Sequence, residues 1–289
     1  MNKKTCIIIC GPTAVGKTSY GIELAQKFQT QIISADSRQC FKELNTGVAK
    51  PSKEQLGKVK HYFINSHSVH DEMNVKTFEE YALNAVNEIF KKNDVAIMVG
   101  GTGLYIKAFA EGIDEIPGID ENIRREINDK YLKNGFQWLH DEIKFHDHDF
   151  FENGEMQNPQ RMLRALEVKI STGKSILSFH SGKKMNRNFE IKNILLELSR
   201  DQLYTNINNR VDQMMEEGLL KEAESLFPYR HLNALQTVGY KELFEYFEGK
   251  ISLEKAVEEI KKNTRHYAKR QVTWFKKMQH SIKKQSNVL

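Results

Sequence analysis

The chain has 289 residues and a formal net charge of +5, with 39% hydrophobic and 28% charged residues. This composition supports a folded core, and no apolar run approaches the roughly 20 residues that a membrane-spanning helix needs. The three cysteines, Cys6, Cys10 and Cys40, form no CxxC pair, so neither a disulfide framework nor a zinc site is expected. No signal-peptide pattern is present, and we expect a cytoplasmic protein.

The positive charge is concentrated at the C-terminal end. From Lys250 onward, eleven Lys and Arg residues stand against three Glu, so this segment carries +8 and the preceding part −3. A near-neutral body with a basic tail indicates either a polyanionic partner or a solvated helix face, and the charge alone does not choose between them.

Short apolar runs alternate with helical patterns in the first third of the chain. The pattern predicts buried strands at 6–10, 31–35, 61–65 and 95–99, and a helix at about 17–28. Thr77 and Glu80 have the spacing of a capping box for a helix that runs to about Lys91. Continuous apolar strands separated by helices predict an α/β fold with a parallel sheet flanked by helices.

The alternation stops after Ala110. A loop with Gly112, Pro117 and Gly118 leads into helical patterns over 120–172, and a strand pattern returns at 194–198. This order predicts a mostly helical insertion domain at 112–192 within a core domain of 1–111 and 193–289. The polar stretch 178–188 is expected to be a mobile loop. The core domain is expected to end in helices, the last from about 253 to 280.

The strongest local motif is G-P-T-A-V-G-K-T at 11–18, which fits the phosphate-loop pattern G-x-x-x-x-G-K-[ST] between a strand and a helix. Backbone N–H groups of such a loop surround phosphate oxygens, and the helix N-terminus adds partial positive charge. Lys17 supplies a point charge, and the Thr18 hydroxyl typically reaches Mg²⁺. The motif predicts phosphate binding by Gly11, Pro12, Thr13, Ala14, Val15, Gly16, Lys17 and Thr18.

A second motif, S-A-D-S-R-Q at 34–39, follows the second predicted strand. Ligands of open α/β sheets bind at the carboxyl ends of strands, so Asp36 is expected to face the same crevice as the phosphate loop. There it could act as a metal ligand or a general base. Alternatively, Asp36 is a turn or helix-capping residue.

A third motif, V-G-G-T-G-L-Y at 99–105, follows the strand predicted at 95–99. Its glycines allow the backbone and the Thr102 hydroxyl to approach a ligand closely. A P-loop NTPase often has an acidic Walker-B residue at the end of such a strand, and here Gly100 stands there. This disfavours ordinary ATP hydrolysis and favours another phosphate ester.

Three further segments carry basic side chains. Arg161 and Arg164 share a helix face in the insertion, where they could clamp phosphates, grip a nucleic-acid backbone or simply be solvated. Arg210 by itself is an ordinary helix arginine. The segment K-R-Q-V-T-W-F at 269–275 mixes basic and aromatic residues, of which Trp274 and Phe275 are expected in the core.

Together, and in this order, these segments resemble the tRNA dimethylallyltransferase (tRNA delta(2)-isopentenylpyrophosphate transferase) family of bacterial type. The resemblance covers nearly the whole chain and also includes G-V-A-K-P at 47–51, N-P-Q-R at 158–161 and T-V-G-Y-K-E-L at 237–243. It implies a P-loop NTPase-like fold. It further implies transfer of a dimethylallyl group from dimethylallyl diphosphate to N6 of adenine 37 in tRNAs that read codons beginning with U.

The resemblance also implies a role for each motif. The phosphate loop would hold the diphosphate of the prenyl donor rather than ATP, with Mg²⁺ shared through Thr18. Lys17 and Arg210 would neutralise the departing diphosphate, Asp36 would accept the N6 proton, and Thr102 would position the reacting groups. The implied tRNA contacts are Asp36, Ser37, Arg38, Gln39, Gln160, Arg161, Met162, Leu163 and Arg164, of which Ser37 and Gln39 would contact the flipped-out adenine.

The sequence departs from the usual family pattern at Arg38, Cys40, Phe41 and Asn158, and we expect altered tRNA contacts rather than a different reaction. The expected partner is the anticodon stem–loop of tRNA, with part of the basic tail against the stem, and the protein is expected to act as a monomer without a membrane. Three alternatives stay open: a P-loop small-molecule or nucleotide kinase with a helical lid, an adenylate isopentenyltransferase, and a non-catalytic RNA-binding protein.

Overall fold

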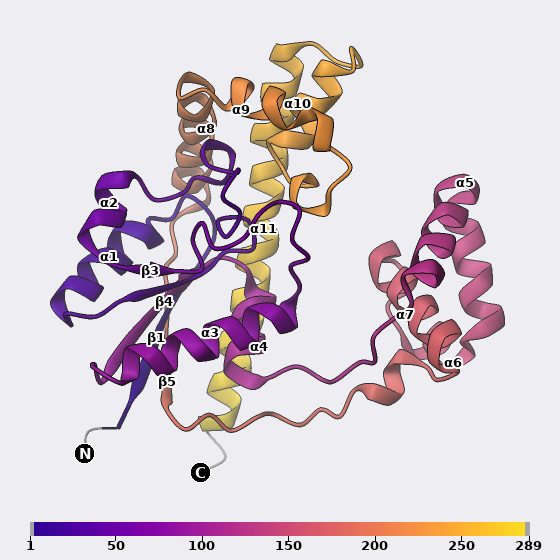
Figure 1. The fold of residues 1–289 in the computed structure, drawn as a ribbon, viewed down its shortest axis with the longest axis horizontal. Coiled ribbons are helices and arrows are strands. Elements are labelled where there is room, and N and C mark those ends of the chain that lie inside the picture. The colour runs from indigo at the N-terminus through magenta and orange to yellow at the C-terminus, as the bar shows by residue number, and fades with distance from the viewer. Residues whose placement is uncertain (1–2, 287–289) are drawn as a thin grey trace. The chain divides into compact units, whose positions relative to one another are not determined.

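The computed structural model describes residues 3–286, which divide into two compact units (Figure 1). Unit 1 comprises 1–111 and 186–289, and unit 2 comprises 112–185. The described residues include no helix long and apolar enough to cross a membrane.

The second boundary of the insertion lies at 185, not at the expected 192. The Arg187 guanidinium donates hydrogen bonds to the backbone carbonyls of Ala108 and Phe109 and pairs with Glu79. Phe189 is buried in the main core of unit 1. The sequence pattern does not predict this boundary, because Arg187 and Phe189 are single side chains in an otherwise irregular segment. Of the predicted mobile loop 178–188, residues 178–179 belong to a 3₁₀ turn (Ile176–Phe179), whereas 180–188 form no helix or strand, and their mobility stays a prediction.

Unit 1 is built on a five-stranded sheet in the order β3-β2-β4-β1-β5, with every pair parallel. This is the P-loop NTPase-like arrangement that the sequence predicts. The strands are β1 (Thr5–Cys10), β2 (Ile32–Ala35), β3 (His61–Tyr62), β4 (Val95–Gly100) and β5 (Glu190–Leu195).

The last strand was predicted too late in the chain, at 194–198. In the structure Glu190 pairs with Thr5 and Leu195 pairs with Cys10, so β5 begins four residues earlier. An edge strand pairs on one side only and needs no continuous apolar run. The start of β5 contains charged and polar residues that are partly exposed, so a search for apolar runs does not recognise it as a strand.

Helices cover both faces of the sheet (Figure 1). One face packs on α1 through Ile9, Ile22 and Ala25, and the other packs on α3 and α4 through residues such as Ile8, Phe78 and Ile106. The helices of unit 1 are α1 (Lys17–Lys27), α2 (Lys53–Lys58), α3 (Val75–Phe90), α4 (Gly103–Glu111), α8 (Arg200–Glu216), α9 (Leu219–Leu226), α10 (Tyr240–Phe247) and α11 (Leu253–Ser286), with short 3₁₀ turns η1 (Thr46–Val48), η3 (Phe227–Tyr229) and η4 (Asn233–Leu235).

The start of α3 differs from the prediction. Asn74 is the N-cap, and its side chain accepts a hydrogen bond from the Thr77 backbone N–H at 3.0 Å. Thr77 therefore lies inside the first turn and is not the capping residue. Asn and Thr are both good caps, and the extended backbone of Asn74 selects the earlier position.

Unit 2 is helical and has its own core. It consists of α5 (Glu121–His146), which is kinked at Gly135, α6 (His148–Asn153), α7 (Pro159–Thr172) and the 3₁₀ turn η2 (Ile176–Phe179). Leu139 and Ile143 of α5 pack with Met162 and Leu166 of α7, and all four are fully buried.

One carboxylate fastens the loop after β2 to the C-terminal helices. Glu222 of α9 accepts hydrogen bonds from three successive backbone N–H groups, those of Asn45, Thr46 and Gly47, and from the Tyr240 hydroxyl at 2.6 Å. The Tyr240 ring is fully buried against Gly47, where an added Cβ would lie 2.6 Å from the ring. The motifs at 47–51 and 237–243 therefore meet in space.

We expect Glu222→Ala to lower the free energy of unfolding by about 2 kcal/mol, because it leaves the buried Tyr240 hydroxyl and the three N–H groups without their acceptor. Urea denaturation measures the change. Glu224→Ala is the control, since Glu224 lies exposed on the same helix and should shift stability by less than about 0.5 kcal/mol. Equal effects of the two substitutions would contradict the role of Glu222.

Candidate functional site

The phosphate loop joins β1 to α1 at the carboxyl edge of the sheet. Gly16, with φ of 95°, is the N-cap of α1, and Ala14 also has a left-handed backbone with φ of 63°. These two residues turn the chain sharply before the helix. Such turns aim successive backbone N–H groups into one concavity, which is the arrangement that binds a phosphate.

Lys17 of α1 folds over this loop. Its ammonium donates hydrogen bonds to the backbone carbonyls of Gly11 at 3.0 Å and Pro12 at 2.6 Å. Burial lowers the pKa of Lys17 to about 8, against the opposing pull of Asp36 and with a smaller contribution from the Arg210 charge. An anion bound in the loop would favour the charged form of this side chain.

Two side chains of α8 reach the same loop. Arg210 donates a hydrogen bond to the Thr13 hydroxyl at 3.3 Å, and burial lowers the pKa of its guanidinium. Asn206, one turn earlier, donates to the backbone carbonyl of Ala14 at 3.2 Å. The structure thus brings Arg210 to the loop as the family resemblance implies. Asn206 was missed, although its spacing of four residues from Arg210 places both on one helix face.

Asp36 lies where β2 ends, and its Oδ1 accepts hydrogen bonds from the N–H groups of Arg38 at 2.9 Å and Gln39 at 3.3 Å. The carboxylate therefore does cap a turn. Within the described residues, its other oxygen, Oδ2, has no hydrogen-bond partner. One oxygen fixes the carboxylate in place, and the second is available to a substrate.

Thr102, which follows β4, is held beside Asp36. Its Oγ1 accepts a hydrogen bond from the Ser37 N–H at 3.1 Å, and its N–H donates to the Ala35 carbonyl at 3.2 Å. The Tyr267 hydroxyl of α11 lies close to the Thr102 side chain. Tyr267 is 36% exposed, yet desolvation of its hydroxyl raises the pKa of Tyr267 to about 12, and the nearby Asp36 charge adds to this shift. Tyr267 is a second residue that the sequence reading did not single out.

Gln39 and the two residues after it serve the fold. The Gln39 side chain donates to the carbonyls of Val48 at 3.2 Å and Ala49 at 3.1 Å, and accepts from the Ser34 hydroxyl. Cys40 and Phe41 are buried in the core. The departures at Cys40 and Phe41 therefore lie in the core rather than on the surface, and the expectation of altered tRNA contacts stays a prediction.

The helix α11 packs across the end of β4. An added Cβ on Gly103 would overlap the Trp274 ring, so this glycine allows the helix to approach. Trp274 is half-buried and Phe275 is fully buried, which confirms that both belong to the core.

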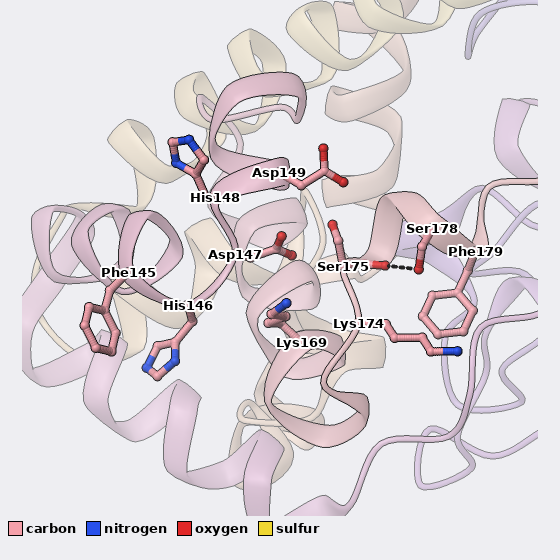
Figure 2. A pocket seen from close by; sticks show the side chains of 10 residues that line it. All are labelled: Phe145, His146, Asp147, His148, Asp149, Lys169, Lys174, Ser175, Ser178 and Phe179. Carbon is pink, nitrogen blue, oxygen red and sulfur yellow. Dashed lines mark hydrogen bonds between the residues drawn. The ribbon is translucent and has the colours of Figure 1, made fainter.

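Unit 2 contains a cavity of about 780 Å³ (Figure 2). It is lined by Phe145, His146, Asp147, His148, Asp149, Lys169, Lys174, Ser175, Ser178 and Phe179. The side chains of His146 and His148 point apart, and the described residues contain no cluster of three His, Cys, Asp or Glu fit to hold a metal. Asp147 accepts a hydrogen bond from the Phe150 N–H and so caps α6. None of the phosphate-loop residues lines this cavity.

Comparison with known proteins identifies the family of this chain. The family model for IPP transferase matches residues 39–278. The chain belongs to the IPP transferase family. It is 49% identical over 284 residues to the tRNA dimethylallyltransferase of Flavobacterium johnsoniae, covering 96% of this chain and 92% of that one. It is also 49% identical over 271 residues to the tRNA dimethylallyltransferase of Christiangramia forsetii, covering 94% and 90%.

Solved structures give the same family. The tRNA isopentenylpyrophosphate transferase from Bacillus halodurans has a TM-score of 0.67 and 35% identity, over 95% of this chain and 87% of that one. A eukaryotic dimethylallyltransferase, described as acting on tRNA, has a TM-score of 0.77 and 28% identity, over 94% and 69%.

In this IPP transferase, the N-P-Q-R motif begins α7 of the insertion. The Asn158 side chain accepts hydrogen bonds from the N–H groups of Gln160 and Arg161, with Pro159 in the first turn. Asn and Asp cap helices about equally well, so the departure at Asn158 preserves the helix start.

Only part of the implied tRNA-contacting segment faces solvent. Met162 and Leu163 are buried in the core of unit 2, so their side chains do not face solvent, and a contact of these two residues with tRNA stays a prediction. Successive residues of a helix point in different directions around its axis, and Met162 and Leu163 point to the apolar side of α7. Gln160 and Arg161 are exposed, and Arg164 is half-buried beside Glu167 at 3.4 Å.

The basic tail of the IPP transferase is partly neutralised within the protein. Lys255 and Lys262 pair with Glu259, and Lys261 pairs with Asp212 and Glu258. Lys269 and Arg270, further along α11, are exposed. The side chains of Lys283 and Lys284 lie outside the described residues.

The lowered pKa of Lys17 predicts how diphosphate binding depends on pH. Above a pKa of about 8 the free side chain is neutral, so binding must take up a proton, and affinity should fall up to about tenfold per pH unit. Calorimetric titration with inorganic diphosphate between about pH 7 and about pH 9 measures this. Lys17→Met is the control, because this variant lacks the titrating ammonium, so its diphosphate affinity changes with pH only through ionisation of the diphosphate. The same dependence of diphosphate affinity on pH in the unaltered protein and in Lys17→Met would contradict the prediction.

Proposed function

We propose that this IPP transferase is a tRNA dimethylallyltransferase that prenylates N6 of adenine 37 in tRNAs that read codons beginning with U. The donor is dimethylallyl diphosphate, and diphosphate is released. The observation that carries the proposal is the placement of Lys17 and Arg210 at one phosphate loop, with Asp36 and Thr102 on the neighbouring strand ends. The curated relatives named tRNA dimethylallyltransferase support it.

The reaction needs charge neutralisation and alignment more than a hydrolytic water. The bond between N6 and the allylic carbon forms as the bond between that carbon and the diphosphate oxygen breaks, and the diphosphate keeps the electron pair. Positively charged groups aimed at the leaving group stabilise the charge that develops there. In this chain the proposed groups are Lys17, Arg210 and the phosphate-loop backbone N–H groups other than those of Pro12, which has none, and Thr13, which donates to Gln271.

Asp36 is the proposed base. An aromatic amine is a weak nucleophile, and a carboxylate within hydrogen-bond reach accepts its proton as it attacks. The two turn hydrogen bonds to Oδ1 hold the carboxylate still, so that Oδ2 can face the adenine. Thr102 fixes the same turn through the Ser37 N–H and so aligns base and donor.

Mg²⁺ fits this site as an ion carried with the donor. The described residues provide no cluster of carboxylates for a resident metal, whereas Mg²⁺ at phosphates usually uses few protein ligands and several waters. The Thr18 hydroxyl, at the first turn of α1, is the proposed protein ligand. The ion would supply positive charge to the diphosphate oxygens.

The acceptor is proposed to be the anticodon stem–loop. The adenine must leave its stack to reach Asp36, which costs a few kcal/mol, and contacts to the RNA backbone offset this cost. Ser37 and Arg38 of the turn, Gln160, Arg161 and Arg164 of α7, and the exposed Lys269 and Arg270 of α11 are the proposed contacts. We further propose that the protein acts as a monomer and works in the cytoplasm, where it meets tRNA.

A transfer assay tests the function. The protein is incubated with labelled dimethylallyl diphosphate, Mg²⁺ and an unmodified tRNA that reads a codon beginning with U. We expect N6-dimethylallyladenosine in the digested tRNA, and none from a transcript with guanine at position 37. Prenylation of AMP in preference to tRNA would favour the adenylate isopentenyltransferase alternative. Phosphoryl transfer from ATP, without prenyl transfer, would favour a kinase.

Substitution of Asp36 tests the base. Asp36→Asn keeps an Oδ1 for the turn but cannot accept the proton, so kcat should fall by about 10²–10⁴ while the Kd for tRNA stays within about threefold. Asp71→Asn is a matched control, because the exposed Asp71 also accepts a turn N–H, that of Ser68. Full activity of Asp36→Asn would rule out this carboxylate as the base.

A further inference from the structure

One buried side chain of the C-terminal helix reaches both the donor loop and the turn that carries Thr102. The Gln271 side chain accepts a hydrogen bond from the Thr13 N–H at 2.8 Å and donates one to the Gly101 carbonyl at 2.9 Å. Its exposed fraction is 6%. It lies 258 residues from Thr13 along the chain, so this contact exists only in the folded protein.

The local structure is shaped around this amide. An added Cβ on Gly101 would overlap the Gln271 Nε2, so glycine is needed at that position for the amide to fit. Tyr267, Gln271 and Trp274 are spaced four and three residues apart, which places them on one face of α11. They meet Thr102, Gly101 and Gly103 respectively.

The chemistry of the two contacts favours an amide. The Thr13 N–H needs an acceptor, and the Gly101 carbonyl needs a donor. A glutamine side chain offers both, whereas a carboxylate offers only acceptors and an ammonium only donors. An apolar side chain would leave two backbone groups unsatisfied in a buried place.

We propose that Gln271 is a positioning residue for prenyl transfer, which holds the donor loop at a fixed distance from the turn that carries Thr102. The link continues from Thr102 to the Ser37 N–H, and so to the turn that holds Asp36. Gln271 thereby aligns the diphosphate with the base without contacting either. Because the neighbouring Lys269 and Arg270 are exposed on the same helix, the helix proposed to touch tRNA also sets the shape of the donor site. This inference rests on the proposed function.

The first test is diphosphate binding by the full chain. Gln271→Met keeps the size of the side chain and removes both hydrogen bonds. We expect the Kd for inorganic diphosphate with Mg²⁺, and the KM for dimethylallyl diphosphate, to rise about tenfold, as for the loss of one good hydrogen bond. The KM for tRNA should stay nearly unchanged, whereas the thermal midpoint should fall by a few degrees, because the Thr13 N–H and the Gly101 carbonyl lose their buried partner. Thr273→Ala is the matched control, because its exposed hydroxyl donates to the Lys269 backbone carbonyl within the same helix.

The second test is a double-mutant cycle. Gly101→Ala should displace the Gln271 amide and weaken diphosphate binding in the same way. If both residues act through one link, the effects of Gly101→Ala and Gln271→Ala will not add.

The outcomes separate the two proposals. Unchanged diphosphate binding by Gln271→Met, or additive effects in the cycle, would overturn the role of Gln271. A loss of tRNA affinity equal to the loss of diphosphate affinity would also overturn it, by showing a general structural role. Failure of the unaltered protein to bind diphosphate would instead refute the proposed function.

Discussion

The site depends on the register of three parallel strands. Cys10 of β1 and Ala35 of β2 both pair with Gly100 of β4, so these three strands end at one level. The phosphate loop follows β1, the turn that carries Asp36 follows β2, and the turn that carries Thr102 follows β4. Because parallel strands all point the same way, three motifs that are distant in sequence emerge side by side at one edge. The register thus makes a single site from separate motifs.

The C-terminal helices complete this site from the opposite end of the chain. Arg210 contacts the donor loop, Gln271 ties that loop to Gly101, and Tyr267 meets Thr102. Glu222 anchors the loop after Asp36 through three backbone N–H groups. Each hydrogen bond contributes only about 1 kcal/mol to stability, but buried groups left unpaired cost more than that. The helices therefore fix the geometry of the site as well as covering it.

The differences between prediction and structure share a physical cause. β5 begins earlier than predicted because pairing with β1, not apolar content, defines an edge strand. Met162 and Cys40 belong to motifs read as tRNA-contacting, yet they are buried, because residues of one short motif point in different directions. Asn74 rather than Thr77 caps α3, since the backbone before the helix decides which of two good caps is used.

The sequence by itself determined the alternation of buried strands and helices, the phosphate loop and the family, because these depend on local composition and spacing. It also identified Asp36, Thr102 and Lys17 as candidates from their places after strands. For Arg210 the family resemblance implied a place at the donor diphosphate, but only the tertiary structure gave its contact with Thr13, and only the tertiary structure placed Gln271 at this loop. Their contacts cross most of the chain, and a helix arginine or glutamine carries no local signal of the backbone group it will meet. Local composition and spacing therefore determine the motifs, whereas long-range packing determines which distant side chains contact them.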